Sequence, residues 1–343
     1  MSTQTDMALT EAEIGGLESG EDQPLTGPGS EGVETFDCRK AFAETLIELA
    51  RQDERIVAVC NDSVGSSNLG GFKKEFPDRL INVGIAEQDL VGVAAGLANG
   101  GMIPFASAAG PFLTGRALEQ IKADVAYSGF RVVLCGQSPG IAYGELGPTH
   151  HSIEDLAWMR AIAGLPVVVP ADPAQTRAAV RWAAEQETGS YLRIGRFKVP
   201  ATTPDGAAFE TGKAVQLTDG DDAAILALGT LVPRAVDAAR QLRAEGIGVR
   251  VLNMTFVHPL DTDAVLTAAQ TGGVVTAEEA TVSGGLGAAV ASLLSQERPT
   301  PMRILGVPNV FAPTGDAGYL LEYFGLTVDG LVTAVRQVLG DGR

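Results

Sequence analysis

Residues 82–89 read Asn-Val-Gly-Ile-Ala-Glu-Gln-Asp and place one glutamate after a glycine-containing turn, at the head of a helix of small residues. The pattern predicts that helix over about 85–99, with apolar residues almost all round it, which is typical of a buried helix. A carboxylate buried there is costly unless something specific pairs with it, so Glu87 is a candidate for acid–base chemistry. The alternative is an acid that the helix dipole simply favours at a helix N-terminus.

A second candidate is the loop over 144–154, which reads Gly-Glu-Leu-Gly-Pro-Thr-His-His-Ser-Ile-Glu and holds two of the three histidines of the chain. Ligands of α/β proteins usually bind in loops at the carboxyl ends of parallel strands. A histidine there can donate to a substrate hydroxyl, or exchange a proton with it, near neutral pH. A metal site and a structural histidine pair are the alternatives, but neighbouring ligands that face apart make a poor metal site.

A third candidate is the cluster of cations in 191–200, which reads Tyr-Leu-Arg-Ile-Gly-Arg-Phe-Lys-Val-Pro at the end of a predicted strand. A guanidinium suits phosphate because it makes two parallel hydrogen bonds. We interpret Arg193 and Lys198 as surface charges.

Together these segments resemble the transketolase family of thiamine diphosphate enzymes. In that family the glutamate matching Glu87 hydrogen-bonds N1′ of the aminopyrimidine and favours the imino tautomer, which takes the proton from thiazolium C2. A buried acid with a raised pKa suits that role. The resemblance also implies that Phe112, in the segment 110–116, stacks on the pyrimidine, although a phenylalanine at a strand-to-helix corner is often plain core. Larger transketolases carry a second aromatic residue where this chain has Gly115.

The resemblance implies further roles for residues in the same segments. Cofactor contact is implied for Asp62 and Ile85, and substrate contact for His150 and His151. Arg196 matches the arginine of the family that binds the phosphate of a sugar phosphate, and Ser67 is a weaker match to a phosphate-contacting serine. Two departures concern specificity: Leu146 stands where sugar-phosphate transketolases have an aspartate, and Ser138 where they have a substrate-facing histidine. Loss of these polar groups predicts altered selection of the donor or acceptor, unless Glu145 turns inward instead.

The other half of a thiamine diphosphate site is not recognisable in the sequence. The family binds the diphosphate and Mg²⁺ through Gly-Asp-Gly and a later Asn, and oxygen ligands suit that ion. Asp205-Gly and the run 219–222 lack this context. We therefore expect no metal ligands in this chain and an N-terminal, diphosphate-binding partner subunit that holds Mg²⁺ and shares the cofactor in an α2β2 assembly.

The predicted function is that of the small, C-terminal subunit of a split transketolase. It would transfer a two-carbon ketol unit from a ketose or ketose phosphate to an aldehyde, and only with its partner. The alternatives are the β subunit of a 2-oxoacid dehydrogenase E1, a two-carbon transferase with a carrier-bound acceptor, and a non-catalytic scaffold subunit. The Gly-Pro-Thr-His-His loop favours a transketolase over an E1 β chain, and the retained Glu87 counts against a scaffold.

The elements that must position these residues follow an alternating pattern from about residue 37, which predicts two α/β units with parallel-sheet cores. We expect a pyrimidine-binding domain over 35–200, a linker over 201–209 and a transketolase-like C-terminal domain over 210–343. Ser152 to Asp155 resemble a capping box for a helix that ends near Arg160, and Asp172-Pro173 should start another helix. Strands are expected at 56–60, 102–106, 131–135, 166–169, 190–194, 223–228, 249–252, 273–277 and 302–305, and helices at 38–51, 114–127, 232–245, 261–269, 285–295 and 328–339.

Composition excludes several other classes of protein. The 343 residues carry a net charge of −17, which argues against nucleic acid and anionic membrane surfaces as partners. Residues 1–34 contain no Lys or Arg, which predicts a disordered acidic tail or, alternatively, a docking arm. No membrane span and no secretory signal are recognised, so we expect a cytoplasmic protein. Cys38, Cys60 and Cys135 are too widely spaced for a zinc site and too few for a disulfide framework.

Overall fold

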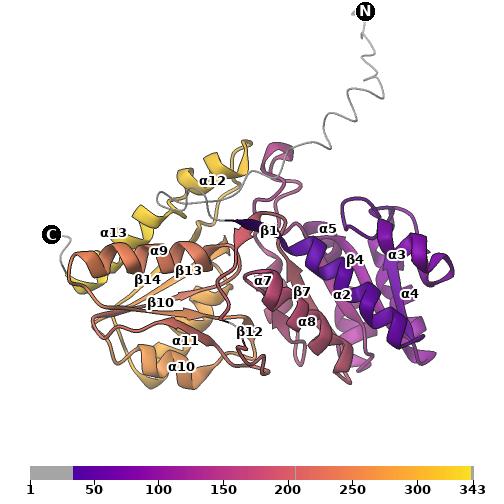
Figure 1. Ribbon diagram of the computed structural model, residues 1–343, viewed down its shortest axis with the longest axis horizontal. Helices are drawn as coiled ribbons and strands as arrows, with labels where there is room; N and C mark the ends of the chain where they lie inside the picture. Colours follow the sequence, from indigo (N-terminus) through magenta and orange to yellow (C-terminus); the bar gives the residue numbers. More distant parts are fainter. Residues whose placement is uncertain (1–33, 205, 341–343) are drawn as a thin grey trace, which may run out of the picture.

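The computed structural model describes residues 34–204 and 206–340, so the predicted tail over 1–34 lies outside the described residues except for Glu34. The chain folds into two α/β units that lie side by side, each with a sheet between layers of helices (Figure 1). None of the helices in the described part of the chain is long and apolar enough to cross a membrane.

The first unit contains a seven-stranded sheet. Its strands are β2 (Ile56–Cys60), β3 (Leu80–Asn82), β4 (Ile103–Ala109), β5 (Val133–Gln137), β6 (Val167–Val168), β7 (Ser190–Ile194) and β12 (Phe256–His258). They lie in the order β12-β6-β7-β5-β4-β2-β3, and every pair is parallel except β12 with β6. The strands β2, β5 and β7 are buried along their whole length, as expected for a parallel sheet that helices cover on both faces.

Helices surround this sheet, and two of them, α2 and α8, begin at an aspartate whose side chain caps the first turn. They are α2 (Cys38–Gln52), α3 (Gly70–Glu75), η1 (Pro77–Arg79), α4 (Glu87–Asn99), α5 (Gly110–Arg116), α6 (Leu118–Gln120), η2 (Ile121–Tyr127), η3 (Gly144–Leu146), α7 (Asp155–Arg160) and α8 (Pro173–Glu185). Asp172 caps α8 as predicted, because its carboxylate accepts from the amide of Gln175 at 2.9 Å. The predicted capping box of α7 is wrong: Ser152 forms a β-bridge with Gly140, and Asp155 is bound to Arg193 instead.

The second unit is a smaller sheet of five strands. They are β9 (Val215–Thr218), β10 (Ala223–Ala227), β11 (Val249–Asn253), β13 (Val274–Thr281) and β14 (Met302–Val307), in the order β14-β13-β10-β11-β9 with only β9 antiparallel to its neighbour. The helices are α9 (Leu231–Ala244), α10 (Thr262–Ala268), α11 (Leu286–Glu297), α12 (Ala317–Tyr323) and α13 (Val328–Leu339). In Figure 1, α9 and α13 cover one face of this sheet and α10 and α11 the other.

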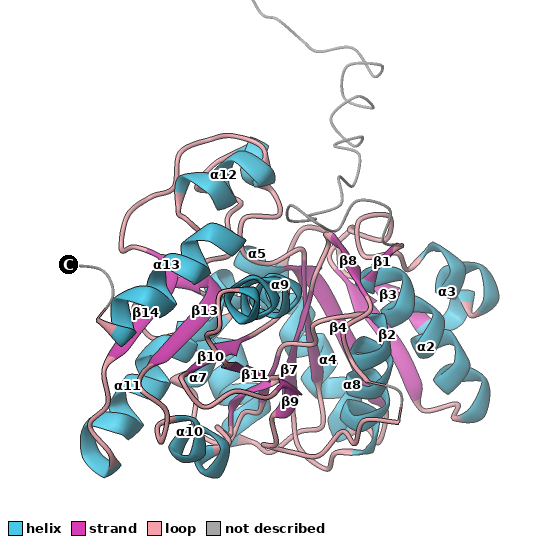
Figure 2. Ribbon diagram, turned by 60° about the vertical axis from the view of Figure 1, so that its left-hand side comes forward, coloured by secondary structure: helices cyan, strands magenta, loops and turns pink. Residues whose placement is uncertain are grey.

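Three features fasten the two units together. The strand β12 comes from the second half of the chain but pairs with β6 at the edge of the first sheet, with Phe256 opposite Val168. A short ribbon of β1 (Thr35–Asp37) and β8 (Lys198–Pro200) ties the start of the described chain to the end of the first unit (Figure 2). One apolar core cluster also includes residues of both units.

A further link between the units corrects a sequence-based interpretation. Arg193 is not a surface charge, because it is buried and bonded to the fully buried Asp155, with Nε 2.8 Å from the carboxylate. Its Nη2 also donates to the backbone carbonyl of Glu279 at 2.9 Å, across the boundary between the units. Because the buried carboxylate of Asp155 pairs with the guanidinium, the charged side chain of Arg193 can point into the protein from its position in the strand.

Two local expectations also differ from the structure. The helix predicted over 114–127 is broken into α5, α6 and the π-helical η2. The helix at 85–99 begins at Glu87 and buries only one face, with Gln88, Asp89 and Gly96 exposed.

Candidate active site

Glu87 is the first residue of α4 and lies at the carboxyl end of the first sheet, just beyond β3. Only 4% of the surface of Glu87 is exposed to solvent. The carboxylate has partners from two other elements: Asn61, which follows β2, donates to Oε1 at 2.8 Å, and Nη1 of Arg116 lies 3.0 Å from each carboxylate oxygen. Glu87 is therefore a buried acid that the chain itself fully pairs.

This pairing decides the charge of Glu87. Burial alone raises the pKa of the carboxyl, but hydrogen bonds from Arg116, from the helix N-terminus and from Asn61 together outweigh it, so the pKa lies below its ordinary value. The raised pKa expected from the sequence is therefore wrong for this chain on its own. The expectation failed because it took burial into account without the cation that the fold brings to the carboxylate.

Phe112 lies in α5, directly after β4, and its half-buried ring links Glu87 to the histidine loop. The guanidinium carbon of Arg116 lies 4.0 Å from the centroid of the ring, over its face. The ring of His150 lies at 5.0 Å with an interplanar angle of 76°. One face of Phe112 is thus covered by a flat cation, and an imidazole packs against the ring in a T-shaped contact.

His150 is half-buried between two aromatic rings. Besides Phe112, it faces Tyr143 at 6.3 Å between centroids, and its Nδ1 lies 3.0 Å from Oγ1 of Thr149. Burial, and then the positive charge of Arg116, lowers the pKa of His150 below its ordinary value. The imidazole is consequently neutral near pH 7 and able both to donate and to accept a hydrogen bond.

Arg196 follows the end of β7, and its guanidinium lies 5.2 Å from the centroid of Tyr143. Contacts therefore run without interruption from Arg196 through Tyr143, His150 and Phe112 to Glu87. We call these five residues, together with Arg116, the contact track. Its members follow parallel strands of one sheet, at the edge where ligands bind in such folds.

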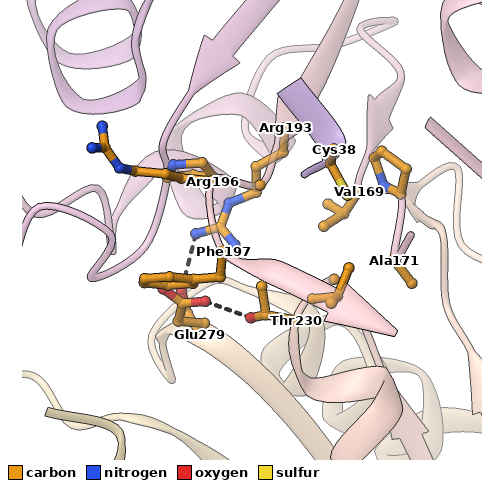
Figure 3. A pocket seen from close by; sticks show the side chains of 13 residues that line it. Cys38, Val169, Ala171, Arg193, Arg196, Phe197, Thr230 and Glu279 are labelled. Atoms are coloured by element: carbon orange, nitrogen blue, oxygen red, sulfur yellow. Dashed lines mark hydrogen bonds between the residues drawn. The ribbon is translucent and has the colours of Figure 1, made fainter. Parts of the chain in front are cut away.

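The two arginines near the end of β7 point to different surroundings. Figure 3 shows Arg193 directed at Glu279, which in turn accepts a hydrogen bond from Thr230, whereas the side chain of Arg196 extends away from them. Among the described residues, no carboxylate lies within ion-pair distance of Arg196. Arg193 therefore joins the two units, and Arg196 is the arginine that is free to meet an anion.

The other predicted residues lie around the track. His151 is buried, with Nε2 3.3 Å from the carbonyl of Gly144, and burial lowers its pKa. Asp62 is exposed and accepts from the side chain of Asn82 at 3.0 Å. Ser67 is buried and is connected to Glu87 by a chain of hydrogen bonds. The hydroxyls of Ser67 and Ser63 are bonded to each other, Ser63 donates to Asn61, and Asn61 donates to Glu87.

Two predicted contact residues are open to solvent. Ile85 lies two residues before Glu87 and is 78% exposed, and Leu146 is 46% exposed on the single turn η3. Ser138, the other departure from the family pattern, is buried with a left-handed backbone (φ 51°).

Sequence reasoning missed Asn61, Arg116 and Tyr143. A signal was available for Arg116, because it lies four residues after Phe112 and side chains at this spacing share one face of a helix. Asn61 could have been found as the first residue after β2, at the carboxyl end of the sheet. The loop position of Tyr143 gave no such signal.

The contact track fits the aminopyrimidine half of thiamine diphosphate. That group is a flat ring that needs a hydrogen-bond acceptor and an aromatic face. Glu87 is such an acceptor and Phe112 such a face, and both are already in contact with the flat, hydrogen-bond-donating guanidinium of Arg116. Within residues 34–204 and 206–340, no group of three or more His, Cys, Asp or Glu side chains is gathered that could hold a metal ion.

Comparison with known proteins agrees with this fold and site. Residues 34–201 match the pyrimidine binding domain of transketolase, and residues 212–331 match the transketolase C-terminal domain. A subunit of the apulose-4-phosphate transketolase of Phocaeicola vulgatus is 44% identical over 86% of this chain and 95% of its own length. The 6-deoxy-6-sulfo-D-fructose transketolase subunit SqwH of Clostridium sp. (strain MSTE9) is 42% identical over 89% and 95%.

A solved structure described as a split gene transketolase, inactive beta4 tetramer, superposes with a TM-score of 0.82. It is 43% identical and covers 90% of this chain and 100% of its own. The chain therefore belongs to the transketolase family, whose members are thiamine diphosphate-dependent transferases. Within that family it is a C-terminal subunit of the split type, like the separate subunits that these names describe.

Proposed function

We propose that this subunit supplies the pyrimidine half of the cofactor site and one wall of the substrate site in a two-subunit transketolase. The enzyme transfers a two-carbon ketol unit from a ketose, or ketose phosphate, to an aldehyde. The observation that carries the proposal is the contact track, in which a buried carboxylate, an aromatic face, a neutral histidine and a free arginine follow one another.

Each residue of the track has a chemical task in this proposal. When bound, thiamine diphosphate supplies the nucleophilic carbon for cleavage of the ketose. Glu87 accepts the hydrogen bond from N1′ and holds the proton there, and Phe112 orients the pyrimidine by stacking. Neutral His150 hydrogen-bonds a substrate hydroxyl. Asp62 and Ile85 belong to the cofactor side, and His151, Ser67 and Leu146 to the substrate side.

Arg196 gives the proposal its substrate class. The two relatives described above are named for apulose-4-phosphate and for a sulfo-fructose, both of which carry an anionic group. A guanidinium at the far end of the track, without a carboxylate partner among the described residues, suits such an anion. We therefore infer that the donor or the acceptor is a sugar with a phosphate or a comparable anion.

The partner in this proposal is an N-terminal subunit that binds the diphosphate and Mg²⁺, in an α2β2 heterotetramer. The domain limits 35–200, 201–209 and 210–343 and a cytoplasmic location belong to the same proposal. Support comes from the names of relatives that are separate transketolase subunits. Both relatives are named as transketolase subunits, which favours a transketolase over an E1 β chain.

Reconstitution tests the proposed function directly. The chain is mixed with the diphosphate-binding subunit, and turnover of an anionic ketose with an aldehyde acceptor is measured. Glu87→Gln should assemble normally but lose on the order of 10²-fold or more in kcat, because the amide cannot hold the proton at N1′. Glu75→Gln, which changes an exposed carboxylate paired with Arg51, is the matched control and should leave kcat unchanged. Near-normal turnover of Glu87→Gln would mean that Glu87 has no catalytic role and is only an acid that the helix dipole favours at the N-terminus of α4.

A further inference from the structure

Arg116 makes, within this chain, the two contacts that the proposed function gives to the aminopyrimidine. Its guanidinium is planar and covers the face of Phe112, with the central carbon 4.0 Å from the ring centroid. The same guanidinium donates to the carboxylate of Glu87, with Nη1 3.0 Å from both oxygens. One flat, hydrogen-bond-donating group therefore bridges the aromatic face and the buried acid.

These contacts exclude a second flat group from the same place. A separation of 4.0 Å between the guanidinium carbon and the ring centroid is close packing, which leaves no room for another ring between them. A pyrimidine that stacks on this face and also reaches Glu87 must occupy the volume that the guanidinium fills. The face of Phe112 that Arg116 covers is the face that Arg116 connects to Glu87.

The arrangement also has a physical reason to exist before any cofactor is bound. A buried carboxylate without a cation is costly, and Asn61 alone is a neutral partner for Glu87. Arg116 supplies the charge, yet its side chain is 50% exposed, so it can leave for solvent without unfolding α5. The pair combines a partly exposed ion pair and a cation–π contact, each of modest strength.

We propose that Arg116 is an internal stand-in for the aminopyrimidine, which keeps the half-site closed and Glu87 paired in the lone subunit and withdraws when the cofactor enters. This inference rests on the proposed function, since it assumes that the pyrimidine binds between Glu87 and Phe112. Its consequence is a lowered apparent affinity for the cofactor, because only the fraction of molecules with Arg116 withdrawn can bind.

The test uses the full chain and the hydroxymethyl aminopyrimidine half of thiamine as the probe, with binding followed by ligand-observed NMR. Arg116→Ala should bind the probe roughly tenfold more tightly than the wild type, since the competing contact is lost. Arg116→Lys, which keeps the charge but not the flat fork, should fall between them. Arg51→Ala is the matched control, because Arg51 is a similarly exposed partner of a glutamate, Glu75, and should bind like the wild type.

A second measurement does not depend on any ligand. The carboxyl ¹³C resonance of Glu87, identified by its loss in Glu87→Gln, is titrated in the wild type and in Arg116→Ala. The pKa of Glu87 should rise in Arg116→Ala, since burial remains and the cation is gone. An unchanged pKa would mean that the ion pair does not form in solution and would overturn the proposal.

The outcomes separate this inference from the proposed function. If the wild type binds the probe, Glu87→Gln does not, and Arg116→Ala gains nothing, the pyrimidine site stands and the stand-in role of Arg116 is wrong. If Arg116→Ala binds more weakly, Arg116 supports the ring rather than replacing it, which also overturns the inference. If Glu87→Gln binds the probe as well as the wild type does, or if no variant binds it, the proposed cofactor site fails together with the inference.

Discussion

At the scale of single residues, position along one segment decides what an arginine does. Arg193 lies within β7, where parallel neighbours and helices enclose it, and it is held by Asp155 and by the carbonyl of Glu279. Arg196 lies three residues further on, beyond the end of the strand, and the aromatic ring that it contacts among the described residues is that of Tyr143. The first arginine is used for the fold, and the second is left available for a ligand.

Arg196→Ala should therefore affect anionic substrates selectively. Loss of a charge-assisted contact costs about 1.5–3 kcal/mol, so KM for a phosphorylated or sulfonated sugar should rise by an order of magnitude or more in the reconstituted enzyme. KM for an uncharged analogue should change little. Arg181→Ala, which removes a surface arginine paired with Glu48, serves as the control. Equal effects on charged and uncharged substrates would remove Arg196 from the anion site.

Leu146 should weaken selection at one substrate hydroxyl. An apolar side chain in place of an aspartate offers no acceptor, so substrates without that hydroxyl meet no penalty. In the reconstituted enzyme, Leu146→Asp should sharpen the preference between donors epimeric at that carbon by roughly tenfold. Glu145→Gln tests whether the neighbouring carboxylate already takes the role. A wild type that discriminates sharply, with no change in either variant, would contradict this interpretation of Leu146.

At the scale of elements, the sequence predicted those strands whose own residues form a recognisable apolar run. The runs Ile56–Cys60 and Ser190–Ile194 are strands β2 and β7 with the predicted limits, because short apolar runs between polar segments suit a buried parallel strand. The Asp172-Pro173 pair gave the start of α8 for the same local reason. The ribbon of β1 and β8, the short β3 and the edge strand β12 could not be predicted, since three residues carry too little pattern and their partners lie far away in the sequence.

The candidate site was predictable to a similar depth. The segments around Glu87, Phe112, His150 and Arg196 were found from the sequence, and the structure brings them into one track. The electrostatics of the track were not found, because the pairing of Arg116 with Glu87 is a contact between α5 and α4. Charge on a buried group depends on tertiary neighbours, which a local pattern does not contain.

The N-terminus of α11 provides a pH-dependent element. Glu278 is buried there and accepts from the amides of Leu286 and Gly287, at 2.7 and 2.8 Å. Burial raises the pKa of its carboxyl to about 7, although these amides and two arginines oppose the shift. A folded-state pKa above the unfolded value of 4.5 means that the folded protein keeps a proton that the unfolded chain has lost. Stability must therefore fall as pH rises from about 4.5 to about 7.

Glu278→Gln should remove most of that fall. The neutral amide has no proton to lose, so the decrease in the free energy of unfolding between about pH 5 and about pH 8 should be smaller in the variant by up to roughly 3 kcal/mol. Urea unfolding of the full chain at a series of pH values measures this difference. Glu297→Gln, at the exposed end of the same helix, is the control. Parallel stability curves for Glu278→Gln and the wild type would contradict the prediction.

At the scale of the whole molecule, the contact track is open on the side of α4 and α5. Ile85, 78% exposed, stands beside Glu87, and the half-exposed Arg116 covers the ring of Phe112 from solvent. The exposed face of α4 includes Gly96, where another surface can approach the backbone closely. The end of the track at which Arg116 is half-exposed is thus also the end that the proposed function assigns to a cofactor shared between subunits.

The lone chain should accordingly show no transketolase activity and should bind thiamine diphosphate weakly, whether or not Mg²⁺ is added. It offers an acceptor and an aromatic face for the pyrimidine, but among its described residues no carboxylate cluster gathers to hold a metal ion beside the diphosphate. Most of the affinity for a charged diphosphate should come from the metal and its ligands, since these carry the strongest electrostatic contacts. Calorimetry of the isolated chain with thiamine diphosphate, with and without Mg²⁺, measures this, and addition of the diphosphate-binding subunit should restore tight, Mg²⁺-dependent binding. Tight Mg²⁺-dependent binding to the chain alone would contradict a site shared between two subunits.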